Sequence, residues 1–84
     1  MEEQLTFTTF ILSLSTSVLV GLGELPDPLT NENNVNLPLA KQTINVIEML
    51  MEKTKGNLAE DEDRLVGNIL YDLRMKYVEA AKKQ

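Results

Sequence analysis

The sequence contains no cysteine and no histidine among its 84 residues. Without cysteine there is no disulfide, no thiolate nucleophile and no cysteine metal site. Without histidine, the commonest general base and the commonest metal ligand are missing too. Basic residues are also scarce, since residues 1–40 contain no Lys or Arg and the chain has a net charge of −5. This charge opposes binding to nucleic acid, so we expect no nucleic-acid partner. Because Cys and His are absent, we also expect no metal and no cofactor.

The length and composition are those of one small folded domain. A second core would need roughly 50 residues of its own, which 84 residues hardly allow. Hydrophobic residues make up 43% of the chain and charged residues 25%. These fractions are typical of a folded soluble chain and not of a disordered one. We therefore expect residues 1–84 to form a single domain.

Residues 5–23 contain no charged side chain, and a membrane anchor in this segment is one interpretation. The length is close to the ~20 residues that cross a bilayer. However, seven of the nineteen residues are Ser or Thr, and no Lys or Arg flanks the segment to fix an orientation. Residues 1–3 are Met-Glu-Glu, where a signal peptide would have basic residues, so we expect no signal peptide. We favour a helix that is buried within protein.

The apolar residues of this segment recur at helical spacing and occupy a broad face. Its members are Phe7, Phe10, Ile11, Leu14, Val18 and Leu22. The opposite side has small residues four apart, which we call the small-residue stripe: Thr9, Ser13, Ser17 and Gly21. Small residues at this spacing allow two helix backbones to approach closely. The stripe therefore predicts a helix contact, either within the chain or with a second copy.

Residues 24–36 are rich in Pro and Asn and predict a loop, which we expect Leu25, Leu29 and Val35 to fasten to the core. A second helix should begin near Asn36 and end at residues 53–56, where two lysines and a glycine favour a helix terminus. A third helix should begin at Asn57 and run to about residue 82. So short a joint predicts an antiparallel hairpin of the second and third helices.

The second and third helices have apolar faces for a shared core. On the second helix these residues are Leu39, Ala40, Ile44, Val46, Ile47, Leu50 and Met51. On the third they are Leu58, Leu65, Val66, Ile69, Leu70, Leu73 and Tyr77. The third helix has a second apolar row on its other side, formed by Tyr71, Met75 and Val78, which we call the Tyr71 stripe. Arg74 lies beside it, and Tyr, Met and Arg are enriched in interfaces, so this stripe is a second candidate interface.

Residues that might carry chemistry are few. The acidic run of residues 60–63 suits the first turn of a helix, where the macrodipole favours acids, better than a metal site. The Gly21-Leu-Gly23 segment follows a helix and not a strand, so it predicts a helix terminus and not a dinucleotide site. The hydroxyls of residues 13–17 have no His, and no lysine in the required pattern, to activate them. An enzyme that uses carboxylates such as Glu48 or Asp72 is the weakest interpretation.

Five segments resemble a family of short bacterial proteins in both order and spacing. They are residues 7–14 (FTTFILSL), 23–28 (GELPDP), 36–44 (NLPLAKQTI), 52–58 (EKTKGNL) and 70–78 (LYDLRMKYV). The family is known as domain of unknown function 1844. The resemblance implies a small, cytoplasmic, all-helical protein, and it implies no activity, cofactor or catalytic residue. A hydroxyl residue is usual in this family at the position of Ala59, which implies that Asn57 caps the third helix here.

Together these observations predict an all-α domain of three helices that associates as a homo-oligomer. The first helix has more apolar surface than two further helices can cover, which is the reason to expect association. We expect a non-enzymatic structural or adaptor protein that binds itself and an unidentified protein partner. A membrane-associated protein anchored by residues 5–23 and a carboxylate-dependent enzyme are the alternatives. The candidate interface residues are Phe7, Thr9, Phe10, Ser13, Leu14, Ser17, Gly21, Tyr71, Arg74, Met75 and Val78.

Overall fold

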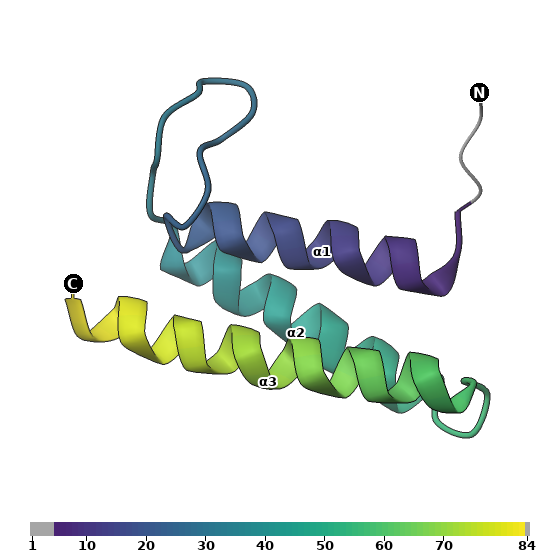
Figure 1. Cartoon of the computed structure of the whole chain (residues 1–84). Coiled ribbons are helices and arrows are strands. Elements are labelled where there is room, and N and C mark those ends of the chain that lie inside the picture. Colours follow the sequence, from purple (N-terminus) through teal and green to yellow (C-terminus); the bar gives the residue numbers. More distant parts are fainter. Residues whose placement is uncertain (1–4, 84) are drawn as a thin grey trace.

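The computed structural model describes residues 5–83, and the interpretation of residues 1–3 lies outside them. The described residues form three α-helices and no strand: α1 (Phe7–Gly21), α2 (Leu37–Lys53) and α3 (Glu60–Lys83). α2 runs antiparallel to both α1 and α3, and each helix contacts the other two (Figure 1). The predicted all-α fold and the α2–α3 hairpin are therefore confirmed.

The core lies between the three helices and is entirely apolar. Among residues 5–83 no polar or charged side chain is buried. The buried residues come equally from the three helices and their ends: Ile11, Val18, Leu22, Ala40, Ile44, Ile47, Val66, Leu70 and Leu73. Burial of apolar surface is consequently the main term that stabilises the fold. All nine buried residues belong to the faces that helical spacing predicts.

α1 begins at Phe7, two residues after the uncharged segment begins. Thr6 is the N-cap, and its hydroxyl accepts a hydrogen bond from the Thr9 backbone N–H at 3.1 Å. The Thr9 hydroxyl in turn accepts one from the Thr6 N–H at 2.9 Å. This reciprocal pair is a capping box, which satisfies two backbone donors that the first turn leaves unpaired.

α1 ends at a glycine terminus, as the sequence predicts. Gly23 has a φ of +81°, a conformation that residues with a side chain rarely adopt. Its N–H donates to the Val20 carbonyl at 3.1 Å, and the Glu24 N–H donates to the Leu19 carbonyl at 2.9 Å. These two bonds form a Schellman motif, which turns the chain out of the helix.

The loop between α1 and α2 is not fastened to the core by its apolar residues, so that expectation is wrong. Leu29 is 93% exposed, and Leu25 and Val35 are 39% and 46% exposed. In Figure 1 the loop stands away from the helices at the end where α1 meets α2.

Hydrogen bonds at the base of the loop explain this shape. The Asn36 N–H donates to the Gly21 carbonyl at 2.7 Å. The Asn33 side-chain amide donates to the Gly23 carbonyl at 2.8 Å. These bonds join the two ends of the loop directly, so the loop closes without help from the core.

α3 begins at Glu60, so the prediction that Asn57 caps it is wrong. The Asn57 N–H instead donates to the Thr54 carbonyl at 2.8 Å and belongs to the turn after α2. The Ala59 carbonyl accepts the first helical bond, from Asp63, at 2.9 Å. Ala59 therefore occupies the cap position, and its N–H donates to the Glu62 carboxylate at 2.9 Å. Only half of a capping box is present, because alanine has no side-chain acceptor.

Replacing Ala59 by serine is expected to stabilise the protein by about 0.5–1 kcal/mol, because the serine hydroxyl supplies the missing cap acceptor. For a domain of this size, that gain raises the melting temperature by a few degrees. Thermal unfolding followed by circular dichroism measures the change. Ala59→Val has no acceptor and serves as the control. An equal or lower melting temperature for Ala59→Ser would contradict this account of the cap.

Candidate functional site

The small-residue stripe of α1 divides into one buried and three exposed residues. Gly21 is buried, whereas Thr9, Ser13 and Ser17 are exposed. A Cβ placed on Gly21 would lie 3.3 Å from the Ala40 Cβ and 3.3 Å from the carbonyl oxygen of Asn36, the N-cap of α2. The contact within the chain that the stripe predicts therefore exists at Gly21 and does not extend to the other three residues.

The aromatic and aliphatic candidates of α1 divide in the same way. Phe7 and Leu14 are half-buried and pack against the core, so they contribute to the fold of the single chain. Helical spacing predicts Phe10 on the core face, but its side chain is 39% exposed. It lies at the edge of that face, where α2 and α3 do not cover it.

The exposed residues of α1 adjoin one flank of α2. Near the contact of Gly21 with Ala40, Val18 is fully buried while Ser17 is exposed, so Ser17 marks the outer flank of α1. On α2, Ile44 and Glu48 line a groove that α3 also lines. α2 therefore has one flank toward the α3 groove and an opposite flank, which adjoins the exposed side of α1. Helical spacing places Leu39 and Val46 on this opposite flank.

Because α1 and α2 pack against each other, these two outer flanks lie side by side, and we call them together the α1–α2 outer face. Its residues are Phe10, Ser13, Ser17 and Val20 of α1, and Leu39, Gln42, Thr43, Val46, Met49 and Leu50 of α2. None of them is charged, and Leu39 and Met49 are 51% and 48% exposed. α2 ends in Lys53, and its other charged residues lie at other positions around the helix: Lys41, Glu48 and Glu52. The surface is thus free of charge, and six of its ten residues are apolar.

None of the six residues that α2 contributes to this face is among the interface candidates that the sequence predicts. Leu39 and Val46 were assigned to the core face, but Leu39 is half exposed and Val46 is only partly buried. Their spacing of seven residues was the available signal, since it places both on one line along the helix. The apolar positions of α2 therefore serve two faces, and not the single face that the sequence predicts.

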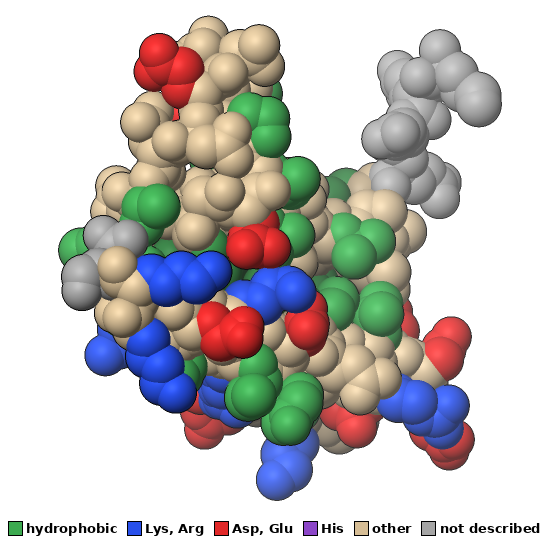
Figure 2. Space-filling view, turned by 60° about the vertical axis from the view of Figure 1, so that its left-hand side comes forward, with side chains coloured by type: hydrophobic (Ala, Val, Ile, Leu, Met, Phe, Trp, Pro, Cys, Tyr) green, Lys and Arg blue, Asp and Glu red, His purple; other side chains and the backbone are tan. Residues whose placement is uncertain are grey.

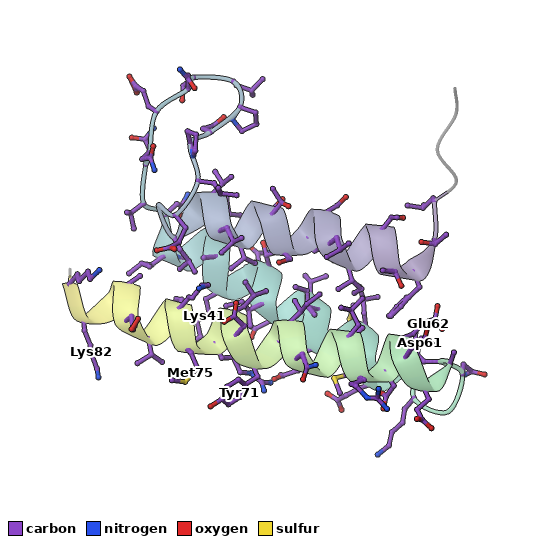
Figure 3. All side chains as sticks on the ribbon, in the orientation of Figure 1. Lys41, Asp61, Glu62, Tyr71, Met75 and Lys82 are labelled. Atoms are coloured by element: carbon purple, nitrogen blue, oxygen red, sulfur yellow. The ribbon has the colours of Figure 1, made fainter. Side chains whose placement is uncertain are left out.

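The Tyr71 stripe lies on the side of α3 away from the core. Tyr71, Met75 and Val78 are 66%, 52% and 48% exposed. In Figure 3, Tyr71 and Met75 project from α3 away from α1. The prediction that this row is separate from the core is therefore correct, although the structure does not test its use as an interface.

Arg74, the charged candidate beside that stripe, forms an ion pair with Glu48 across the α2–α3 groove. Both side chains are about half exposed, so the pair contributes at most about 1 kcal/mol to stability. Its two members also line an open groove of about 540 Å³ whose floor includes Met51 and Leu70. The rim of this groove has charges of both signs and, among the described residues, no hydroxyl side chain.

The carboxylates considered for catalysis have basic neighbours at the surface. Glu48 is paired with Arg74, and Asp72 lies 3.8 Å from the Lys76 ammonium one turn along α3. The acids of residues 60–63 occupy the first turn of α3, where Glu60 pairs with Arg64 at 3.0 Å. Within residues 5–83, no three acidic side chains come together as metal ligands would. The acidic run therefore has the structural position that the sequence predicts for it.

Charge is unevenly distributed over the surface. On the face shown in Figure 2, basic side chains appear only over the lower part of the molecule, where α2 and α3 lie. The first basic residue of the chain is Lys41, in α2, so α1 and the loop contain none.

None of the helices formed by residues 5–83 is both long and apolar enough to cross a membrane. The membrane span considered for residues 5–23 is therefore not found.

The fold and its surfaces define a small three-helix domain with two exposed apolar surfaces. The chain matches the family described as domain of unknown function (DUF1844) over residues 4–79, and it belongs to that family. The match confirms the family resemblance seen in the five sequence segments. Among curated proteins, none matches this chain. Among solved structures, none matches it either.

Proposed function

We propose that this chain is a non-enzymatic helical module that associates with itself and acts as a structural or adaptor protein. The observation that carries the proposal is the exposed side of α1. α1 has fifteen residues and none is charged, although six of its residues are largely exposed: Thr9, Phe10, Leu12, Ser13, Thr16 and Ser17. The solvent side of a surface helix normally has charged or polar residues. Here it has four hydroxyl residues and no charge, and the exposed Phe10 and Leu12 beside them support an interaction site.

The side-chain chemistry supports a role without catalysis. The sequence has no histidine or cysteine, and Glu48 and Asp72 both have basic neighbours. The grooves of the domain are open and lie between charged rims. Side chains of this kind suit binding to protein better than the activation of a nucleophile.

The adaptor part of the proposal depends on the Tyr71 stripe. This stripe is distinct from the exposed side of α1, so it leaves room for a different protein partner while α1 is occupied. Tyr71 and Met75 are residue types enriched in interfaces. A cytoplasmic location, which the family resemblance implies, is part of the same proposal.

Thermal unfolding at several protein concentrations tests self-association. Association stabilises a folded protein by mass action, so the melting temperature of an oligomer rises with concentration. We expect the melting temperature to rise by several degrees over a hundredfold range of protein concentration. If unfolding is fully coupled to dissociation, that range changes the free energy of unfolding by about 2.7 kcal/mol. A melting temperature that is independent of concentration would contradict the proposal.

A further inference from the structure

We infer that the α1–α2 outer face is the site of self-association and that its occupant is the same face of a second copy, related by a two-fold axis. This inference rests on the proposed function and specifies its surface. The interface candidates that the sequence predicts lie on α1 and the Tyr71 stripe, whereas the structure places uncharged, exposed or partly buried residues of α1 and α2 on one face.

Charge favours this face for the meeting of identical chains. Each copy has a net charge of −5, so two copies repel each other in general, and an uncharged contact surface adds no close like-charge pair to that repulsion. The ten residues of the α1–α2 outer face have no charge, and Lys53 lies only at the end of α2. The surroundings of the Tyr71 stripe are different, because Arg74, Asp72 and Lys76 lie on the same helix beside it. Of the two surfaces, the outer face is the one that buries no charge.

The shape of the face suits a two-fold arrangement. Its α1 half is lowest at Ser13 and Ser17, which lie between the larger Phe10 and Val20. Its α2 half is raised by Leu39, Val46 and Met49. A two-fold axis between the halves places the raised α2 of one copy over the low α1 of the other. Isologous contacts of this kind are self-complementary and closed. The result is a four-helix arrangement of two α1–α2 pairs, with each α3 on the outside.

The area of the face places the expected dimer among small interfaces. α1 and α2 have 15 and 17 residues. Two helices of this length, about 22–25 Å long and about 10 Å wide, present roughly 450 Å² in projection. A standard interface buries about 800 Å² per partner, so this one lies at the small end. We therefore expect a dimer with a dissociation constant in the micromolar range, which dissociates on dilution.

Glutamate substitutions of matched charge and exposure test which surface associates. Leu39→Glu and Ser13→Glu place a carboxylate on the outer face, one from each helix. Met75→Glu places the same charge on the Tyr71 stripe, where Met75 is 52% exposed against 51% for Leu39. All three variants have the same net charge, so general repulsion between copies is equal. All three positions are exposed in the single chain, and far-UV circular dichroism verifies that each variant is folded.

Sedimentation velocity of the four proteins is expected to separate them clearly. Leu39→Glu and Ser13→Glu should each raise the dissociation constant at least tenfold, because a carboxylate would be buried without a partner. Met75→Glu should associate as the unmodified chain does. If Met75→Glu alone dissociates, or if Ser13→Glu has no effect, the assignment of the face is wrong although self-association stands. If the unmodified chain is a monomer, the proposed function itself is wrong.

Discussion

Replacing Ile47 by alanine is expected to remove most of the stability of this domain. Ile47 lies in the middle of α2. Its side chain is one of the largest fully buried side chains in the core. Truncating a buried isoleucine leaves a cavity and costs about 2–5 kcal/mol. Small domains have little more than about 5 kcal/mol in total. We therefore expect Ile47→Ala to be largely unfolded well below the melting temperature of the unmodified chain.

Urea denaturation followed by circular dichroism measures this loss, with Met49→Ala as the matched control. Met49 lies two residues further along the same helix but is 48% exposed. Measured at a protein concentration below the micromolar range, where the expected dimer dissociates, its truncation should change the stability of the single chain by no more than about 0.5 kcal/mol. Equal denaturation midpoints for the two variants would show that the assigned core is wrong.

Replacing Gly21 by valine is expected to force α1 and α2 apart. A Cβ at this position already lies 3.3 Å from both the Ala40 Cβ and the Asn36 carbonyl oxygen, and one of these neighbours is backbone that cannot rotate away. The two further methyl groups of valine have still less room. Overpacking at such a contact costs about 1–3 kcal/mol, and this position belongs at the upper end of that range.

Gly67→Ala is the control for Gly21→Val. A Cβ on Gly67 would have its nearest neighbour at 4.0 Å, the mobile end of the Met51 side chain. Alanine is favoured over glycine inside a helix by about 1 kcal/mol, so this variant should be slightly more stable than the unmodified chain. Thermal unfolding compares the two. A Gly21→Val variant as stable as Gly67→Ala would contradict the close approach of α1 and α2.

The α2–α3 hairpin is the part of the fold that the sequence predicts best. α2 has charged residues at defined positions, so its core face is evident from helical spacing. The end of α2 is also predicted correctly, since Gly56 has a φ of +87° in the turn that follows the helix, where the sequence predicts a glycine terminus. Two details of the hairpin differ from the prediction: Leu39 and Val46 lie outside the core face, and the cap of α3 is misplaced. Asn57 is a better capping residue than Ala59, and sequence preference alone selects it.

α1 is harder to interpret because it has no charged residue to mark its solvent side. Helical spacing places Phe10 with the core, and yet it is 39% exposed. Only the position of α2 and α3 decides which part of a broad apolar face is covered. For the same reason the α1–α2 outer face was not visible in the sequence. It consists of residues from two helices whose alignment depends on the contact of Gly21 with Ala40.

The loop shows a different limit of sequence analysis. The apolar side chains of Leu25, Leu29 and Val35 suggest that the loop packs against the core. Instead, hydrogen bonds from Asn33 and Asn36 join the two ends of the loop. Pairings of this kind between residues ten or more positions apart leave no periodic signal in the sequence. The shape of the loop therefore could not be predicted.

The mass of the full chain in solution is the most direct test of the central claim, which is self-association. One chain has a mass of 9.5 kDa. In sedimentation equilibrium, the mass is expected to rise with concentration toward about 19 kDa, because an interface of this size dissociates in the micromolar range. A mass of 9.5 kDa at every concentration up to about 100 µM, where a micromolar dimer is nearly complete, would contradict the account.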